Sequence, residues 1–177
     1  MRTLMWTVAA TLLAACGGSE PAPAPEPAPA KVEKKAKAEK KAEPKEEKVD
    51  LTTLSPEEQK AKLMEIGEKV YKTGGKKGLA CNTCHQDNGK GVPGAFPPLA
   101  GQKDHMGDCA KHAGIVINGL QGEIEVDGVT YNGVMTPQGD LLTDLEIAAV
   151  ITYERFSWGN DFGVCMPEQV AAARQGG

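Results

Sequence analysis

Residues 81–85 read Cys81-Asn82-Thr83-Cys84-His85, and the interpretation of the whole fold starts from this stretch. The spacing C-x-x-C-H is typical of the segment to which a c-type haem is attached. Each thiol adds to one vinyl group of the haem, and the histidine that follows binds the iron as its proximal ligand. We therefore expect Cys81 and Cys84 to hold one covalent haem c and His85 to be an axial iron ligand.

Two other interpretations of the cysteine pair require different surroundings. A thioredoxin-like redox pair needs a βαβ pattern around C-x-x-C, and the sequence shows none. Half of a zinc site needs a second C-x-x-C or an H-x-x-x-H, and the sequence contains neither. Haem attachment is the interpretation that the downstream sequence supports.

The composition leaves room for a large cofactor. The chain has 177 residues, a formal net charge of −4 and only 5% aromatic residues. Residues 1–50 differ in composition from the rest, which suggests one globular domain at residues 51–160 and a C-terminal tail at residues 161–177. With so few large apolar side chains, a buried porphyrin would supply much of the missing apolar area.

The N-terminus looks like a targeting segment. Residues 1–15 contain one positive charge, at Arg2, and then an apolar run. At about 12 residues this run is shorter than the roughly 20 that cross a bilayer, which is typical of a signal peptide. The sequence LAAC at residues 13–16 resembles the cleavage box of bacterial lipoproteins, which implies that Cys16 is acylated and anchors the chain to a membrane. An ordinary signal peptide cut nearby is the alternative.

Residues 16–50 are expected to form a flexible linker. Proline alternates with alanine or glutamate over residues 21–30, which favours extended polyproline II. Residues 31–48 are almost all Lys, Glu and Ala, and they offer no apolar face that a helix could bury. We interpret the segment as a solvated spacer, with a specific binding role for its lysines as the alternative.

Two capping boxes predict the main helices of the domain. A helix at residues 55–73 begins with the sequence SPEE and stops at two glycines. A helix at residues 143–158 begins with TDLE and is closed by Gly159. The apolar residues of the second helix do not fit one stripe, so we expect burial on two sides. Gly67 lies inside the first helix, where a glycine suggests the close approach of another element.

Shorter elements are expected elsewhere. Residues 108–118 predict a short helix closed by Gly119, and residues 167–174 predict another in the tail. Residues 123–131 alternate around an Asp-Gly pair, which indicates a β-hairpin with a tight turn. Adjacent prolines in the sequence FPPL at residues 96–99 exclude a helix and predict a stiff strap.

The strap and a methionine are candidates to complete the haem site. A strap near the haem would offer a backbone carbonyl to the free ring nitrogen of His85 and so raise the basicity of the ring. Methionine and histidine are the usual ligands for the sixth iron position. Met135 is the best placed, because it follows the hairpin in a loop from which the chain can wrap over the cofactor. Among the other methionines, Met64 is expected to pack in the first helix, Met106 lies in a polar stretch, and Met166 lies in the tail.

Two further arrangements of the sixth position remain open. His105 or His112 would give a bis-histidine site, although we expect both side chains at the surface. An open sixth position is the other alternative.

Four motifs occur in a familiar order: CNTCH at residues 81–85, FPPLAG at 96–101, YNGVM at 131–135 and AAVITY at 148–153. In this order the chain resembles a class I c-type cytochrome over roughly residues 57–160. The resemblance implies an all-α fold, a small helical bundle around one covalent haem c, here with a short β-hairpin insertion.

The resemblance also assigns roles to single residues. Pro97 would supply the carbonyl for His85, and Met135 would be the distal ligand. The N- and C-terminal helices of this family cross, and the residues expected to meet there are Gly67 and Tyr71 against Val150 and Tyr153.

Cys109 and Cys165 are left after the other three cysteines are assigned. A disulfide between them would pin the tail to the helix at residues 108–118, as expected in an oxidising compartment. By loop-entropy arguments it would contribute on the order of 4 kcal/mol. Two buried thiols are the alternative.

Charge is distributed unevenly over the globular part. Residues 91–177 carry four bases and eleven acids, whereas Lys76, Lys77 and Lys90 flank the haem motif. A positive rim of this kind would steer docking with an acidic partner, and plain solubility is the alternative. Nothing in the sequence indicates nucleic-acid binding or a small-molecule substrate, and no catalytic triad or acid pair stands out.

These observations predict a membrane-tethered, periplasm-facing electron carrier with redox proteins as donors and acceptors. Its single haem would be ligated by histidine and methionine, a combination that raises the reduction potential. One alternative is a gas-binding or redox-sensing cytochrome in which Met135 dissociates. Another is a fixed electron-transfer subunit of a larger respiratory complex.

Overall fold

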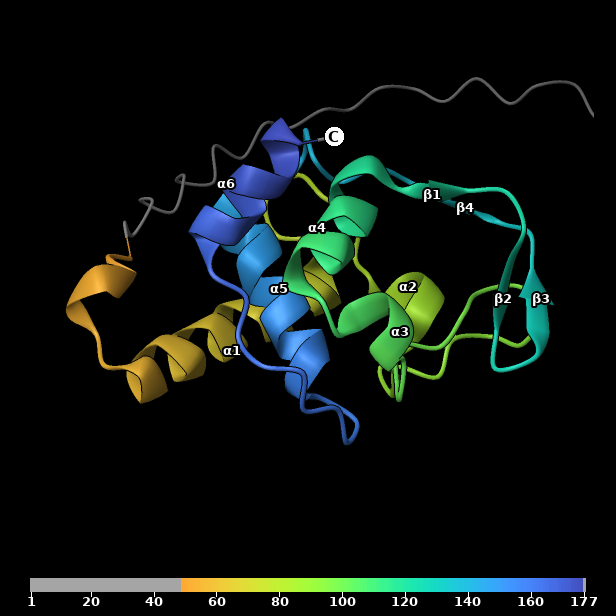
Figure 1. Cartoon of the computed structure of the whole chain (residues 1–177), viewed down its shortest axis with the longest axis horizontal. Helices are drawn as coiled ribbons and strands as arrows, with labels where there is room; N and C mark the ends of the chain where they lie inside the picture. Colours follow the sequence, from red (N-terminus) through yellow and green to blue (C-terminus); the bar gives the residue numbers. More distant parts are fainter. Residues whose placement is uncertain (1–48, 177) are drawn as a thin grey trace, which may run out of the picture. The chain divides into compact units, whose positions relative to one another are not determined.

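Two helices that begin with the predicted capping boxes cross at the centre of the structure (Figure 1). The computed structural model describes residues 49–176. Helix α1 spans Pro56–Thr73, and the Glu58 side chain accepts a 2.9 Å hydrogen bond from the Ser55 N–H. Helix α5 spans Asp144–Phe156 and is capped in the same way by Thr143 and Glu146. Both helices are predicted from their first turns, and both predictions are confirmed.

The crossing of α1 and α5 depends on Gly67. A Cβ atom at this position would lie 2.1 Å from the carbonyl oxygen of Ala149 and 2.7 Å from the Cβ of Tyr153. The ring of Tyr71 lies one turn further along α1, and its centroid is 5.4 Å from that of Tyr153. The expected crossing is therefore present, with the Ala149 backbone as the nearest contact of Gly67.

Helix α5 is buried on several sides, as predicted. It packs against α1, against α4 (Cys109–Asn118) and against α6 (Pro167–Gln175). Residues 161–176 lie on this core rather than apart from it, because Cys165 and Val170 are fully buried. The short helices predicted at residues 108–118 and 167–174 thus correspond to α4 and α6.

Helix α5 ends two residues before the predicted Trp158, at Phe156. Ser157 already has an extended backbone, and its hydroxyl donates a 2.6 Å hydrogen bond to the Tyr153 carbonyl. Trp158 then has a positive φ of 55°, and its indole N–H donates to the Asp87 carbonyl at 3.0 Å. The turn that directs this indole toward the haem motif ends the helix early.

Two antiparallel ladders extend from the helices at the right of Figure 1. Strands β2 (Ile124–Val126) and β3 (Val129–Tyr131) form the predicted hairpin around an Asp-Gly turn. The second ladder was not predicted and pairs β1 (Leu120–Gln121) with β4 (Val134–Met135). It corrects one expectation, since Met135 lies in a short strand rather than in a loop. The strand is invisible to sequence periodicity because it is only two residues long.

Three short helical turns complete the described residues. They are a 3-10 turn at Leu51–Thr53, α2 at Asn82–His85 and α3 at Lys103–Met106. Within residues 49–176, no helix is both long enough and apolar enough to cross a membrane. The predicted signal peptide, Cys16 and the linker up to residue 48 lie outside the described residues.

Candidate haem site

The C-x-x-C-H motif forms a single helical turn at the wall of a cavity. The N–H of His85 donates a 2.9 Å hydrogen bond to the Cys81 carbonyl, which closes the turn. Both thiols are half-buried and free, and Cys81, Cys84 and His85 all line the same cavity. Burial raises the pKa of the Cys81 thiol, and the nearby charge of Glu154 raises it further. Before haem attachment, the Cys81 thiol is therefore a weaker acid than an ordinary cysteine.

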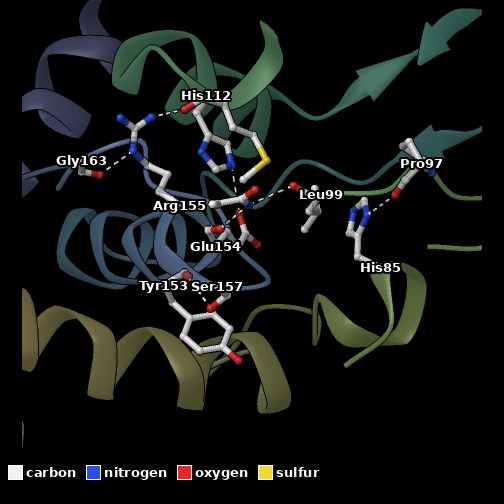
Figure 2. A network of polar contacts seen from close by, with 11 residues as sticks. His85, Pro97, Leu99, His112, Tyr153, Glu154, Arg155, Ser157 and Gly163 are labelled. Atoms are coloured by element: carbon white, nitrogen blue, oxygen red, sulfur yellow. Dashed lines mark hydrogen bonds and ion pairs between the residues drawn. The ribbon is translucent and has the colours of Figure 1, made fainter. Parts of the chain in front are cut away.

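The imidazole of His85 is oriented by the strap (Figure 2). Its Nδ1 lies 2.9 Å from the carbonyl oxygen of Pro97, and the residue is only 8% exposed. The strap itself is fixed by backbone hydrogen bonds, such as that from Leu99 N–H to the Gly89 carbonyl at 2.7 Å. Because Nδ1 is occupied by Pro97, Nε2 is the nitrogen that remains to bind iron.

The cavity beside this histidine is mostly apolar. Side chains from the strap, α3, α4, α5 and β4 close around it. The larger apolar side chains that line it are Leu79, Phe96, Leu99, Met106, Ile115, Val116, Leu120, Ile124, Val126, Val134, Met135, Leu142 and Val150. Two thiols and one imidazole at the edge of an apolar cavity are the donor set that covalent haem c requires, so the residues fit this cofactor.

Two thioethers are presented to the cavity. Met135 is half-buried and is held by the β1–β4 ladder, in which it pairs with Leu120. Met106 is 2% exposed and also lines the cavity, although the sequence around it is polar. Met64 and Met166 are absent from the lining. Among the described residues, the methionine candidates for the sixth iron position are thus Met135 and Met106.

Comparison with known proteins identifies the family. Residues 64–154 match the family model of cytochrome c. This chain belongs to the cytochrome c family. Two proteins named cytochrome c-552, both from Thermus thermophilus, are each 47% identical to it over 101 residues. The match covers 53% of this chain and 69% and 61% of those two proteins.

The predicted class and cofactor are therefore confirmed. This chain is a class I c-type cytochrome with an all-α fold and a small hairpin, and it carries covalently bound haem c. Members of the family are electron carriers rather than enzymes.

Within residues 49–176, the cytochrome also brings together the two cysteines other than Cys81 and Cys84. Cys109 begins α4 and Cys165 precedes α6, and their Cα atoms are 5.6 Å apart with the sulfur atoms in bonding contact. This separation lies within the usual range for a disulfide. Both residues are buried, so the contact fastens the last segment of the chain onto α4.

A buried acid–base pair was missed by the sequence analysis. His112 was expected at the surface, but it is 3% exposed, and its Nε2 lies 2.9 Å from Oε2 of Glu154 (Figure 2). His105 is half-buried, and all three of these side chains line the cavity. The signal was available, because Glu154 interrupts the apolar sequence of the closing helix.

Arg155, the neighbour of Glu154, is a second buried charge. Its guanidinium donates to the carbonyls of Gly163 at 2.8 Å and Gly107 at 3.2 Å, and also to those of Met106 and Phe162. Burial lowers the pKa of this group, and the four carbonyls supply the acceptors that water would otherwise provide. Arg155 thereby connects α3 and the C-terminal segment to α5.

Exposed apolar side chains line the cavity, and exposed lysines lie in the segments that flank the haem motif. Leu79, Phe96 and Val134 line the cavity and are 56%, 37% and 64% exposed. Lys76, Lys77 and Lys90 are exposed in the segments that flank the haem motif. The cavity mouth is thus accessible to another protein.

Proposed function

We propose that this cytochrome is a membrane-tethered electron carrier whose haem iron is ligated by His85 and Met135. The observation that supports this best is the geometry of His85, whose Nδ1 lies 2.9 Å from the Pro97 carbonyl in a cavity that Met135 also lines. Bound haem c would supply an iron that alternates between the ferrous and ferric states. Cys81 and Cys84 would hold it as thioethers and prevent its loss.

The residues around the haem would each influence its reduction potential. The Pro97 carbonyl fixes the orientation of the His85 ring and increases its basicity. As an axial ligand of the bound iron, the thioether of Met135 would raise the reduction potential. The apolar lining would lower the dielectric around the bound iron, which is one of the means by which a protein sets a haem potential.

Redox proteins are the partners that this surface suits. The apolar rim of Leu79, Phe96 and Val134 would bring the partner close to the haem, and the flanking lysines would steer an acidic partner toward it. Weak electron-transfer complexes have small interfaces, so a rim of a few side chains is sufficient.

The tether and the location are supported by the sequence. Acylation of Cys16 would hold the chain at a membrane, and the linker that follows would let the domain reach partners on the periplasmic side. Replacing Cys16 with serine should move the protein from the membrane fraction to the soluble fraction. Mass spectrometry of the N-terminal peptide would show whether acyl chains are present, and a peptide without them would contradict the tether.

Absorbance spectra test the ligation. Ferric protein should show a methionine–iron charge-transfer band, and ferrous protein should not respond to carbon monoxide. The band should disappear in Met135→Leu and persist in Met106→Leu, a matched control because both thioethers line the cavity. Disappearance only in Met106→Leu would reassign the ligand.

One observation favours the gas-binding alternative. Met135 is held by a strand of two residues, next to Val134, which is 64% exposed. A short, exposed ladder opens more readily than a buried helix. If wild-type protein lacks the band and binds carbon monoxide, the carrier proposal gives way to the sensor. Co-purification with one fixed redox partner would instead favour the subunit of a larger complex.

A further inference from the structure

His112 on α4 and Glu154 on α5 form a buried pair at the wall of the haem cavity (Figure 2). Their side chains are 4% and 5% exposed, and the His112 Nε2 to Glu154 Oε2 distance is 2.9 Å. Placing an ionisable pair in the interior costs free energy, and apolar residues of similar volume are often at least as stabilising.

The other ring nitrogen of His112, Nδ1, lacks a hydrogen-bond partner among the described residues. This atom is also buried. When Nε2–H donates to the Glu154 carboxylate, Nδ1 of the neutral imidazole holds an open lone pair. A proton added there gives an imidazolium that keeps its bond to the carboxylate. The pair thereby changes from negative to neutral without moving.

We propose that the His112–Glu154 pair is a proton-binding site coupled to the haem, so that this cytochrome takes up a proton together with its electron. One electron arrives from the redox partner and reduces ferric iron to ferrous, and one proton from water binds at His112 Nδ1. When the iron is oxidised again, the electron passes to the next redox partner and the proton returns to water. The proposal rests on haem binding in this cavity, but not on the membrane tether or on Met135.

Electrostatics explains why the two events are linked. The site is more positive by one charge in the ferric state, and an apolar cavity screens charges poorly. A negative pair stabilises ferric iron, and a neutral pair stabilises ferrous iron. His112 and Glu154 line the same cavity as Cys81 and His85, so the charge of the pair lies at the wall of the haem site. Since coupling is reciprocal, reduction must raise the proton affinity of the pair as much as the proton raises the affinity for the electron.

The charged and titratable groups around the pair come from the helices packed against α4 and α5. On α1, which packs against α5, Tyr71 is close enough for the charge of Glu154 to contribute to its raised pKa. Arg155 is adjacent in sequence, but its guanidinium is committed to backbone carbonyls of α3 and the C-terminal segment. His105 on α3 is the other imidazole at the cavity wall. The remaining charged side chains on α4, on its N-cap and on the helices packed against it are Lys103, Asp104, Asp108, Lys111, Asp144, Glu146, Glu168 and Arg174. None of these eight lines the cavity.

The reduction potential of the holoprotein as a function of pH is the first test. In wild type the potential should fall as pH rises through the interval in which the pair loses its proton, with a limiting slope of about 59 mV per pH unit for a one-electron couple. His112→Gln should flatten this dependence, and His105→Gln, the matched control, should retain it. A wild-type slope in His112→Gln would assign the proton to His105 or to the carboxylates of the haem, and would overturn the proposal.

A second measurement needs no change at the pair. The chain has three histidines, and with His85 on the iron only His105 and His112 remain to titrate. In protein labelled with nitrogen-15 at histidine, NMR should show His112 holding its proton to higher pH in the ferrous than in the ferric state. Each tenfold difference in proton affinity corresponds to about 59 mV of total potential change. Equal titration in both states would contradict the proposal.

The outcome is separable from that of the ligation experiment. If carbon monoxide binds readily and the charge-transfer band is missing, the sixth position is open, yet the histidine titration still reports on His112 and Glu154. Glu154→Gln adds a check of sign, since removing the negative charge should raise the potential at pH values where the wild-type pair is deprotonated. A lower potential in this variant would contradict the proposed electrostatics.

Discussion

Gly67 on α1 and Ala149 on α5 are in backbone contact, since a Cβ atom on Gly67 would lie 2.1 Å from the Ala149 carbonyl oxygen. Real Cβ atoms do not approach a carbonyl so closely, so any larger residue must separate the two helices. The glycine therefore sets the distance at which the first and last helices of the cytochrome domain pack. The same two helices carry Tyr71 and Tyr153, whose rings meet beside this contact.

Replacing Gly67 with alanine should destabilise the protein. Alanine improves helix propensity by about 1 kcal/mol, but overpacking a tight contact typically costs about 1–3 kcal/mol, or more where backbone must move. We expect a net loss in the free energy of unfolding, measured with denaturant on the holoprotein. The control is Lys69→Ala at an exposed position of α1, which should change stability by less than about 0.5 kcal/mol. A Gly67→Ala variant as stable as wild type would show that the crossing tolerates separation.

The hydroxyl of Tyr71 should make the protein sensitive to alkaline pH. It donates a 2.6 Å hydrogen bond to the Gln86 carbonyl, and burial, with nearby negative charge, raises its pKa in the folded state. A raised folded-state pKa contributes stability that is fully present below the unfolded pKa of about 10 and is lost as pH rises above it.

Tyr71→Phe tests this dependence. The variant should lose about 1 kcal/mol at neutral pH, because a hydrogen bond is removed. Above pH 10, roughly the unfolded-state pKa of tyrosine, its stability should decline less steeply than that of wild type. Denaturant unfolding at a series of pH values would measure both effects. Parallel declines in the two proteins would mean that other groups control the alkaline behaviour.

The contact between Cys109 and Cys165 should be a disulfide in protein from an oxidising compartment. Intact, non-reduced protein should then have a mass lower by two hydrogens than after reduction, and the unfolded protein should show no reactive thiol at either position. Replacing both residues with serine should lower the free energy of unfolding by about 2–5 kcal/mol, the usual loss for a native disulfide in a small domain. Thiols that react in unfolded, non-reduced protein would instead indicate two buried free cysteines.

Arg155→Lys should lower the free energy of unfolding more than Arg174→Lys does. A lysine at position 155 cannot reach all four carbonyls, and each buried acceptor left unsatisfied costs about 1–3 kcal/mol. Arg174 is partly exposed, with 27% of its side chain accessible, so water can replace its lost contacts. Denaturant unfolding of the two variants gives the comparison. Equal losses would show that burial of the Arg155 contacts is not what makes them important.

The local sequence was sufficient to predict those elements whose signals lie within a few residues of one another. The capping boxes at Ser55 and Thr143 are satisfied within one turn, and the Asp127-Gly128 turn joins neighbouring strands. These interactions form between residues close in the chain, so their patterns are visible before folding. The order of the motifs was sufficient to predict the family, and the match of residues 64–154 to the cytochrome c family model confirmed it.

Contacts between segments that are distant in the sequence could not be predicted in the same way. The strand that holds Met135 exists because Leu120 lies opposite it, and neither residue has a strand-like neighbourhood of its own. Met106 lies in a polar stretch of sequence, yet α3 places it at the cavity wall. Neither position could be inferred locally, since a segment of a few residues has no periodicity from which burial can be inferred.

The sequence by itself determined the haem-binding motif, the capped helices, the hairpin and the class of protein, because each is written in adjacent residues or in the order of motifs. Only the tertiary structure decided what the cavity contains besides apolar side chains. His112 and Glu154 lie on different helices, and their 2.9 Å contact depends on how α4 packs against α5. Burial and pairing of charges are properties of packed surfaces, and no spacing along a single chain specifies them.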